Sequence, residues 1–313
     1  MASSILMPIS TSPTTLKHTL LFGQSLHQTL QYPNRRASST SFAVRAVILP
    51  NNGKEFVLRH FQQRKALKII AGLHNFNKEN VAAVVTAADK GGATHIDIAC
   101  DSELVKLATS LTSLPICVSS VDPSAFLAAV DAGAHMIEIG NYDSCYEMGI
   151  TFSPEEILNL TKQTKRLLPY VTLSVTVPHT LSLPDQIKLA EMLQQEGADI
   201  IQTEGGKCAN PSQSGVLGLI EKATPTLAAA YSISRAVSIP VMCSSGLSAV
   251  TAPMAITAGA AGVGVGSAIN KLNDVVAMIA AVRSIANALN LPKTVTYLSE
   301  LEDSNETRRI KIQ

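Results

Sequence analysis

Eight short apolar segments recur along this chain, and stretches with the spacing of amphipathic helices separate them. Short apolar runs bounded by Gly, Pro or polar turns are typical of buried strands in a parallel sheet. The pattern therefore predicts repeated strand–helix units. The expected strands are Leu67–Leu73, Thr94–Ala99, Ile116–Ser119, Met136–Ile139, Val171–Val177, Asp199–Thr203, Val241–Ser244 and Gly262–Val265.

Helix start signals occur in the segments between these strands. A capping residue stands directly before Pro at Asp122-Pro123, Ser153-Pro154 and Thr224-Pro225, a combination typical of the first turn of a helix. Ser153 and Glu156 also have the spacing of a capping box. Asp101 follows the second strand, and we interpret it as an N-cap rather than as a catalytic group.

The repeats and the loop lengths together indicate a fold class. Turns from helix to strand are short, whereas long loops follow several strands. Eight strand–helix repeats within about 225 residues favour an α/β fold of the (βα)8 TIM-barrel class over an open, doubly wound sheet. We expect this single barrel domain at residues 65–290, with an amphipathic helix in the leading segment 47–64 closing its bottom and a C-terminal tail at 291–313.

The first 46 residues differ in composition from the rest. They contain no Asp or Glu, are rich in Ser and Thr, and include Lys17, Arg35, Arg36 and Arg45. This composition is typical of an organelle transit peptide and predicts a chloroplast protein of the stroma, with a disordered native tail as the alternative. The five cysteines include no CxxC pair, which predicts reduced thiols and no metal site.

Charge and hydropathy narrow the classes of partner. The formal net charge of +1 does not favour a nucleic acid as partner. Residues 236–270 carry no charge, but they include Pro240, Pro253 and several glycines. A strand–helix–strand unit inside the barrel therefore explains this segment better than a membrane span does.

Strand alternation places polar groups inside the predicted barrel. Because their apolar neighbours must face the helices, Lys68, Asp97 and Glu138 point inward, and Lys68 should pair with one of the two carboxylates. These three residues are candidate catalytic groups for proton transfer or imine formation, with a structural ion-pair network as the alternative. His179 is a candidate base or phosphate ligand, or a plain loop histidine. Further inward positions are Ser119, Thr172, Ser174, Thr176 and Gln202.

Two glycine-rich strand ends are the strongest local signal. The seventh strand ends in Ser244-Ser245-Gly246, and the eighth ends in Gly264-Val265-Gly266-Ser267. In a (βα)8 barrel these neighbouring ends commonly bind phosphate, so Ser244, Ser245, Gly246, Gly264, Gly266 and Ser267 are candidate phosphate ligands. Close packing of small residues is the alternative. The glycine spacing does not fit a dinucleotide fingerprint.

Other mouth loops add weaker candidates. Glu204, Gly205 and Gly206, followed by Lys207, have the composition of a flexible loop that could face the ligand. Asn75, Asn141 and Asp143 also stand in loops that follow strands and could contact a ligand.

Six sequence blocks carry a resemblance to a known family. The blocks are Leu67–Asn77, Asp97–Asp101, Pro115–Pro123, Val175–His179, Gln202–Gly206 and Ile239–Lys271. Over about residues 60–290 the chain resembles the plastid and cyanobacterial family called hypothetical chloroplast reading frame twenty-three. The resemblance implies a plastid compartment and an aldolase-type phosphate-binding barrel, and it transfers no catalytic residue.

Three functional hypotheses remain open. The first is a plastid barrel that binds a phosphorylated small molecule, with lyase, aldolase or isomerase chemistry using Lys68, Asp97 and Glu138 if it is an enzyme. The second is an oxidoreductase that binds flavin mononucleotide, because the phosphate of that cofactor would fit the same strand ends. The third is a non-catalytic barrel that senses a ligand or binds a partner.

Overall fold

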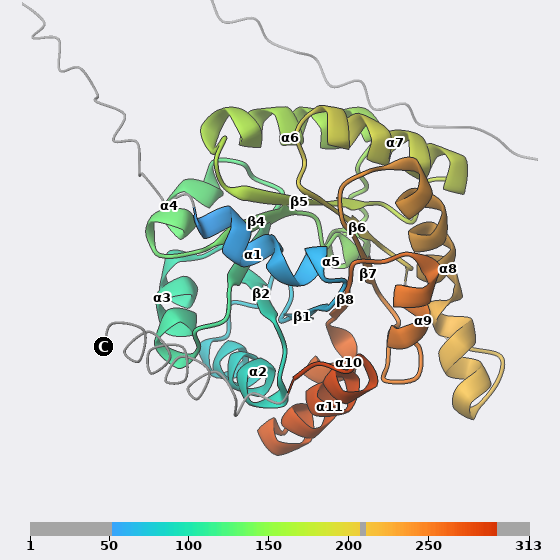
Figure 1. Ribbon diagram of the computed structural model, residues 1–313. Helices are drawn as coiled ribbons and strands as arrows, with labels where there is room; N and C mark the ends of the chain where they lie inside the picture. Colours follow the sequence, from blue (N-terminus) through green and yellow to red (C-terminus); the bar gives the residue numbers. More distant parts are fainter. Residues whose placement is uncertain (1–51, 207–210, 293–313) are drawn as a thin grey trace, which may run out of the picture. The chain divides into compact units, whose positions relative to one another are not determined.

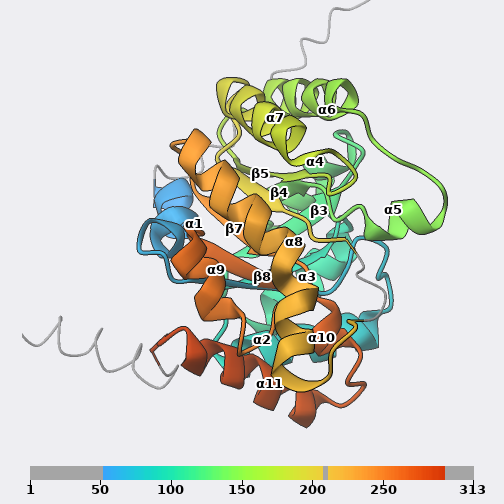
Figure 2. The same ribbon diagram turned by 90° about the vertical axis from the view of Figure 1, so that its right-hand side faces the viewer.

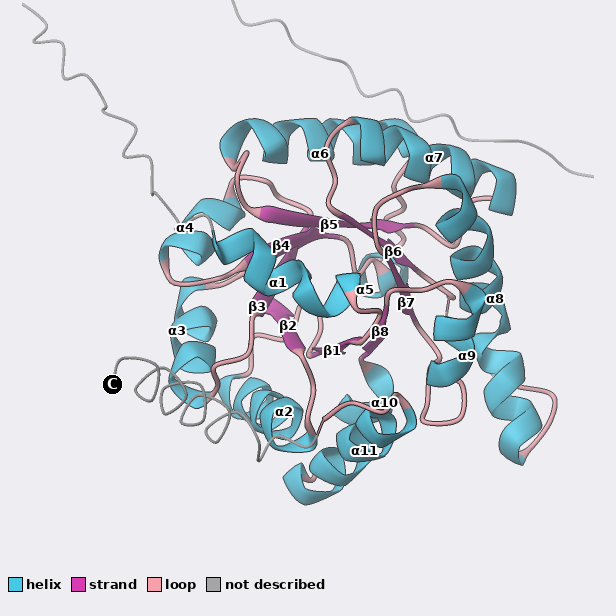
Figure 3. Ribbon diagram, in the orientation of Figure 1, coloured by secondary structure: helices cyan, strands magenta, loops and turns pink. Residues whose placement is uncertain are grey.

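The computed structural model describes residues 52–206 and 211–292 (Figures 1 and 3). The targeting segment predicted at residues 1–46, most of the predicted tail and Lys207 lie outside the described residues. Eight parallel strands form the centre of the fold. They are β1 (Ala66–Ile70), β2 (His95–Ala99), β3 (Ile116–Ser120), β4 (Met136–Ile139), β5 (Thr172–Val177), β6 (Ile200–Thr203), β7 (Val241–Ser244) and β8 (Gly262–Val265).

The strands close into a barrel in chain order. Each strand pairs with the next one, and β1 also pairs with β8, where Lys68 lies opposite Gly264. The TIM-barrel prediction is therefore confirmed, and the open doubly wound sheet is excluded. Paired residues on neighbouring strands point to the same face of the sheet, so Lys68, Gly264 and Ser244 all face the barrel interior.

Helices surround the barrel and cover its outer face (Figure 1). Outward side chains such as Ile69, Ile96 and Ile137 are completely buried against them, as expected of a parallel sheet. A leading helix, α1 (Asn52–Gln62), precedes the strands, and the later helices are α2 (Lys78–Gly91), α3 (Ser102–Leu111), α4 (Ala125–Asp131), α5 (Asp143–Glu147), α6 (Pro154–Leu167), α7 (Leu183–Gln195), α8 (Gly215–Ala236), α9 (Ala252–Ala258), α10 (Ser267–Asn270) and α11 (Val275–Ala288).

Helix α1 (Asn52–Gln62) covers the end of the barrel opposite to α5 (Figure 2). Its Val57 and Phe61 pack into a buried cluster with the inward side chains at the strand starts, including Met136 and Met242. His95 Nε2 donates a hydrogen bond to the carbonyl of Val57 over 3.0 Å. This contact requires a proton on Nε2, and burial lowers the pKa of His95 to about 3. The bottom of the barrel is thus closed by packing around a neutral histidine.

Three local expectations are wrong, and each has a physical reason. Asp122-Pro123 does not start α4, which begins at Ala125 with Ser124 as its N-cap, because Asp122 Oδ1 accepts from the N–H of Ser124 in a turn that precedes the helix. The first strand ends at Ile70 rather than at Leu73, because Gly72 turns the chain with φ +116°. Thr224-Pro225 does not start a helix, because it lies inside α8, where the Thr224 hydroxyl donates to the carbonyl of Ile220. The capping box of Ser153 and the N-cap of Asp101 are both confirmed.

Within the described segments, no helix combines the length and the apolar character needed to span a bilayer.

Candidate functional site

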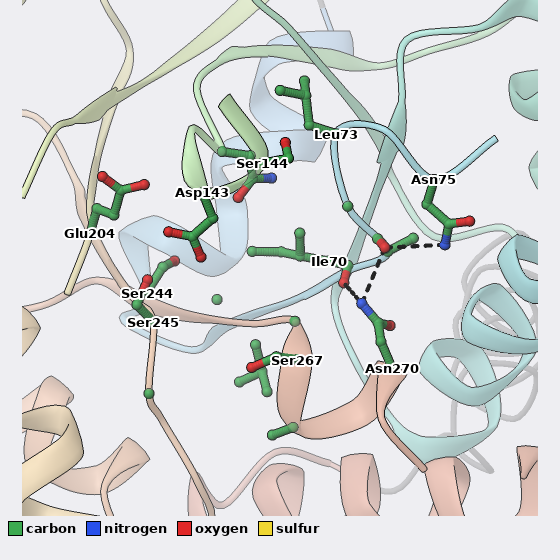
Figure 4. Close-up of a pocket in the computed structure, with 18 of the residues that line it drawn as sticks. Ile70, Leu73, Asn75, Asp143, Ser144, Glu204, Ser244, Ser245, Ser267 and Asn270 are labelled. Carbon is green, nitrogen blue, oxygen red and sulfur yellow. Dashed lines mark hydrogen bonds between the residues drawn. The ribbon is translucent and has the colours of Figure 1, made fainter. Parts of the chain in front are cut away.

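A cavity of about 1170 Å³ opens where the strands end. Figure 4 shows Ser244, Ser245 and Ser267 on neighbouring strand ends, with Glu204 nearby. Loops that follow strands form its wall, as in other (βα)8 barrels. The sequence-predicted residues that line it are Glu204, Gly206, Ser244, Ser245, Gly246, Gly264, Gly266 and Ser267, together with Asn75, Asn141 and Asp143.

The strand ends β7 and β8 present main-chain N–H groups to this cavity. Ser245 and Gly246 both have positive φ, at 80° and 70°, and Gly266 precedes the short helix α10. The N–H groups of Ser245, Gly246, Gly266 and Ser267 donate to no acceptor found among the described residues. Successive amides of this kind form a concavity suited to an anion.

Two glycines of these strand ends are required by packing. A Cβ on Gly246 would approach the carbonyl oxygen of Lys222 to 2.7 Å, and a Cβ on Gly264 would collide with Ser244 Oγ. The close-packing alternative therefore accounts for Gly264. Gly266 is more open, since its Cβ would come no closer than 3.3 Å to the carbonyl of Ile70.

Two cations and an amide that are not among the sequence-predicted site residues also line the cavity. Lys222 of α8, Asn270 of α10 and Lys271 all line the cavity. Asn270 Nδ2 donates to the carbonyls of Ile70 and Ala71 over 3.0 and 3.1 Å and so ties α10 to the end of β1 (Figure 4). Lys271 directly follows the uncharged segment 236–270, so the sequence offered a signal for it. Lys222 offers no such signal, because only the folding of the chain brings α8 to the site.

Glu204, His179 and Tyr146 form a second polar group at the mouth. Glu204 Oε2 accepts from His179 Nδ1 over 2.9 Å, from the His179 main-chain N–H over 3.2 Å and from the Tyr146 hydroxyl over 2.8 Å. The hydrogen bond to Glu204 raises the pKa of His179. Of the three residues, Glu204 lines the cavity. Gly206 packs close to the His179 ring, and Gly205 packs between Thr226 and Ser245.

Lys68, Asp97 and Glu138 form the predicted cluster in the barrel interior. Lys68 Nζ lies 2.5 Å from Glu138 Oε2 and 3.6 Å from Asp97 Oδ2, so the expected pairing is confirmed. All three side chains are at most 1% exposed. Uncharged donors complete the cluster: Ser119 and Asn141 donate to Asp97, and Ser174 and Gln202 donate to Glu138.

This cluster lies apart from the cavity. None of Lys68, Asp97 and Glu138 is among the residues that line it. The two carboxylates raise the pKa of Lys68 against the opposing effect of its burial, so Nζ carries a proton and is not a free amine nucleophile. Burial raises the pKa of Asp97 to about 6, with Lys68 opposing the shift. Asn141, which lines the cavity and donates to Asp97, connects the two levels.

Comparisons with known sequences find matches that span most of the chain. The family model described as "Protein of unknown function (DUF561)" matches residues 51–295. A protein of Cyanophora paradoxa named "Uncharacterized protein ycf23" is 42% identical over 230 residues, which cover 73% of this chain and 94% of that protein. The protein of the same name from Porphyra purpurea is 38% identical over 230 residues, covering 74% and 87%.

Solved structures with a similar fold are distant in sequence. (S)-3-O-geranylgeranylglyceryl phosphate synthase from Thermoplasma acidophilum superposes with a TM-score of 0.52 at 15% identity, covering 76% of this chain and 97% of that one. 3-Hexulose-6-phosphate synthase superposes with a TM-score of 0.51 at 15% identity, covering 71% and 99%. At this identity the likeness shows a shared aldolase-type barrel fold alone.

Proposed function

The chain belongs to the DUF561 family, and on this premise we propose that it binds the phosphate group of a small metabolite at the ends of β7 and β8. The observation that carries the proposal is the set of N–H groups of Ser245, Gly246, Gly266 and Ser267, which have no acceptor among the described residues. Anions bind such amides readily, because the amides keep their geometry without a ligand.

Charge supports the same assignment. Lys222 and Lys271 line the same cavity as the glycine-rich ends, and each can pair with a phosphate oxygen. Glu204 also lines the cavity, but its Oε2 is already engaged by His179 and Tyr146. The phosphate would therefore occupy the β7–β8 side, and the remainder of the ligand would lie toward Glu204.

The groups at the mouth can supply acid–base chemistry to a bound metabolite. Glu204 lines the cavity, and its hydrogen bond to His179 raises the pKa of the imidazole and so favours the protonated form. A carbon or hydroxyl proton of the ligand could pass to Glu204 and be returned from this group, as an isomerase or lyase requires. Lys68, Asp97 and Glu138 would act from beneath the cavity by holding polar side chains in position, because they are fully buried and do not line it.

Introducing a negative charge at Gly266 tests the phosphate site. Gly266→Asp adds a carboxylate beside the proposed anion, and the protein atom nearest to the added Cβ is the Ile70 carbonyl oxygen at 3.3 Å. We expect inorganic phosphate to raise the Tm of the wild type and to have no effect on the Tm of the variant. Each kcal/mol of binding free energy corresponds to about 2–4 °C in a domain of this size.

Gly53→Asp is the matched control. Gly53 lies in α1 at the opposite end of the barrel, and no atom would meet its added Cβ within 4 Å. This variant carries the same change of charge and should keep the phosphate-dependent Tm shift. Equal Tm values with and without phosphate in the wild type would refute the proposed site.

We further propose a plastid location. The acid-free, Ser/Thr-rich composition of residues 1–46 supports import, and the algal relatives carry the name ycf23. Incubation of the labelled full chain with isolated chloroplasts should yield a protease-protected product that lacks this segment. A product of unchanged length that remains protease-sensitive would contradict the proposal.

A further inference from the structure

Two buried polar atoms of residues in the wall of the cavity have no hydrogen-bond partner among the described residues. Gln202 Oε1 and Ser244 Oγ make no hydrogen bond within the described part of the chain. Gln202 is 1% exposed and Ser244 is 4% exposed, and both residues line the cavity. A buried polar atom without a partner is costly, so these two atoms indicate where a ligand makes hydrogen bonds.

The interior cluster determines which end of the Gln202 amide faces the ligand. Gln202 Nε2 donates to Glu138 Oε1 over 2.7 Å and to Thr176 Oγ1 over 3.1 Å. A rotated amide would place its oxygen, an acceptor, against Glu138 Oε1, which is itself the acceptor in this contact. Oε1 is therefore the acceptor that remains, and its partner must be a ligand donor such as a hydroxyl.

Ser244 Oγ lies one level below the phosphate site. Ser244 is in register with Gly264, and an added Cβ on Gly264 would collide with its Oγ. Gly266 lies two residues further along β8, which is about 6–7 Å toward the mouth. The part of the ligand that contacts Ser244 and Gln202 is therefore the part attached to the phosphate, and it lies deeper in the barrel than the phosphate does.

We infer that the ligand is the phosphate ester of a polyhydroxylated carbon chain. Its hydroxyls nearest to the ester donate to Gln202 Oε1 and bond Ser244 Oγ, while its phosphate occupies the amides at the ends of β7 and β8. The inference rests on the proposed phosphate site and specifies the chemical class of what is attached to the phosphate. It also gives Glu138 and Lys68 a positioning role, since they orient the amide of Gln202.

Two small esters that differ only in hydroxyls test this inference. Glycerol 3-phosphate and n-propyl phosphate share a three-carbon chain and a phosphate, and isothermal titration calorimetry gives the affinity of each. We expect the wild type to bind glycerol 3-phosphate at least about tenfold more tightly, which is the size of one to two buried hydrogen bonds. Equal affinities would overturn the inference and leave the phosphate site intact. Failure of both esters and of inorganic phosphate to bind would refute the phosphate site itself.

Ser244→Ala isolates one of the two contacts. The variant should lose most of the preference for glycerol 3-phosphate and keep its affinity for n-propyl phosphate. Because Ser244 Oγ has no protein partner among the described residues, its Tm without ligand should not fall. An equal loss of affinity for both esters would place Oγ on the phosphate instead, and an unchanged preference would exclude the contact; either result overturns the assignment.

Ser174→Ala is the matched control for stability. It makes the same change at another inward position, but Ser174 Oγ donates to Glu138 Oε2 over 2.8 Å. Its Tm without ligand should fall, because the charged carboxylate loses a donor. Gln202→Leu removes the second contact, and this variant should also bind glycerol 3-phosphate and n-propyl phosphate with more similar affinities. If Ser244→Ala lowers the Tm as much as Ser174→Ala does, Ser244 Oγ has a structural partner and the inference is wrong.

Discussion

The lower level of the barrel interior and the mouth above it are both polar, but they differ in how their hydrogen bonds are used. In the lower level, Lys68, Asp97 and Glu138 pair with one another and with uncharged donors. At the mouth, Gln202 Oε1 and Ser244 Oγ have no partner among the described residues. Charge density alone would have pointed to the lower level as the reactive site.

The comparison shows that buried charge and binding capacity are separate properties. A buried ion pair is stable only when its remaining donors and acceptors are satisfied. A group that is satisfied in this way has few donors or acceptors free to bond a ligand. Unsatisfied polar atoms beside a cavity have the opposite character, because a ligand can supply the missing bonds. Gln202 joins the two levels, since its amide nitrogen belongs to the cluster and its oxygen to the cavity.

Removal of the buried cation would break the comparison most strongly. Lys68→Met leaves Asp97 and Glu138 without their counter-ion in a fully buried site. We expect the free energy of unfolding to fall by about 3–5 kcal/mol, measured by urea denaturation at pH 7. A fall this large would identify the cluster as a structural unit.

Two further variants interpret that result. Lys68→Met combined with Glu138→Gln should recover part of the loss, because one uncompensated carboxylate is removed. Lys106→Met breaks the solvent-exposed pair with Glu103 and should leave stability unchanged within error. No recovery in the double variant would argue that packing, and not charge, causes the effect of Lys68→Met.

A smaller effect is expected from His95 and His179, which lie at opposite ends of the barrel and should change the pH dependence of stability with opposite signs. Burial lowers the pKa of His95 to about 3, against about 6.5 in the unfolded chain. Between pH 6.5 and pH 3 the unfolded state binds the additional proton, so the free energy of unfolding falls as the pH is lowered through this window. The slope from one such group is at most about 1.4 kcal/mol per pH unit.

His95→Phe should reduce this acid slope in urea titrations at pH 7, 5.5 and 4, with each variant compared with its own value at pH 7. His179 has the opposite sign, because its raised pKa stabilises the fold below pH 6.5 and the contribution is lost as the pH rises through the raised value. His179→Phe should therefore alter the slope on the alkaline side of pH 6.5. An unchanged acid slope in His95→Phe would mean that His95 titrates normally.

Local patterns predicted most of the fold because each depends on a few neighbouring residues. Strands β4, β7 and β8 have the predicted bounds, since their apolar runs end in turn residues. The prediction for the first strand is too long because apolar residues stand on both sides of Gly72, at Ala71 and Leu73, although the backbone leaves the sheet there. Pro225 misled the prediction of α8, because a helix whose flanks are packed can continue through a proline that its own sequence disfavours.

The candidate site was predictable in part for a related reason. Strand alternation alone indicates that Lys68 and Glu138 point inward, and the need to pair buried charge indicates that they meet. Strand alternation does not indicate that Lys68 and Glu138 lie beneath the cavity. That position depends on how far along the barrel axis each residue lies once the ring of strands is closed. Lys222 could not be found from local pattern, because α8 brings it to Gly246 from a segment more than twenty residues away.

Local sequence patterns are enough to specify the repeated strand–helix units, the inward row of polar residues and the glycine-rich ends of the last two strands. These features follow from side-chain periodicity and backbone freedom, which act over a few residues. Which of the polar atoms are satisfied depends on the closed barrel, because a hydrogen bond between strands requires a particular register and distance across it. The closed ring satisfies Glu138 through Lys68, Ser174 and Gln202, and it leaves the oxygen of Gln202 to the cavity.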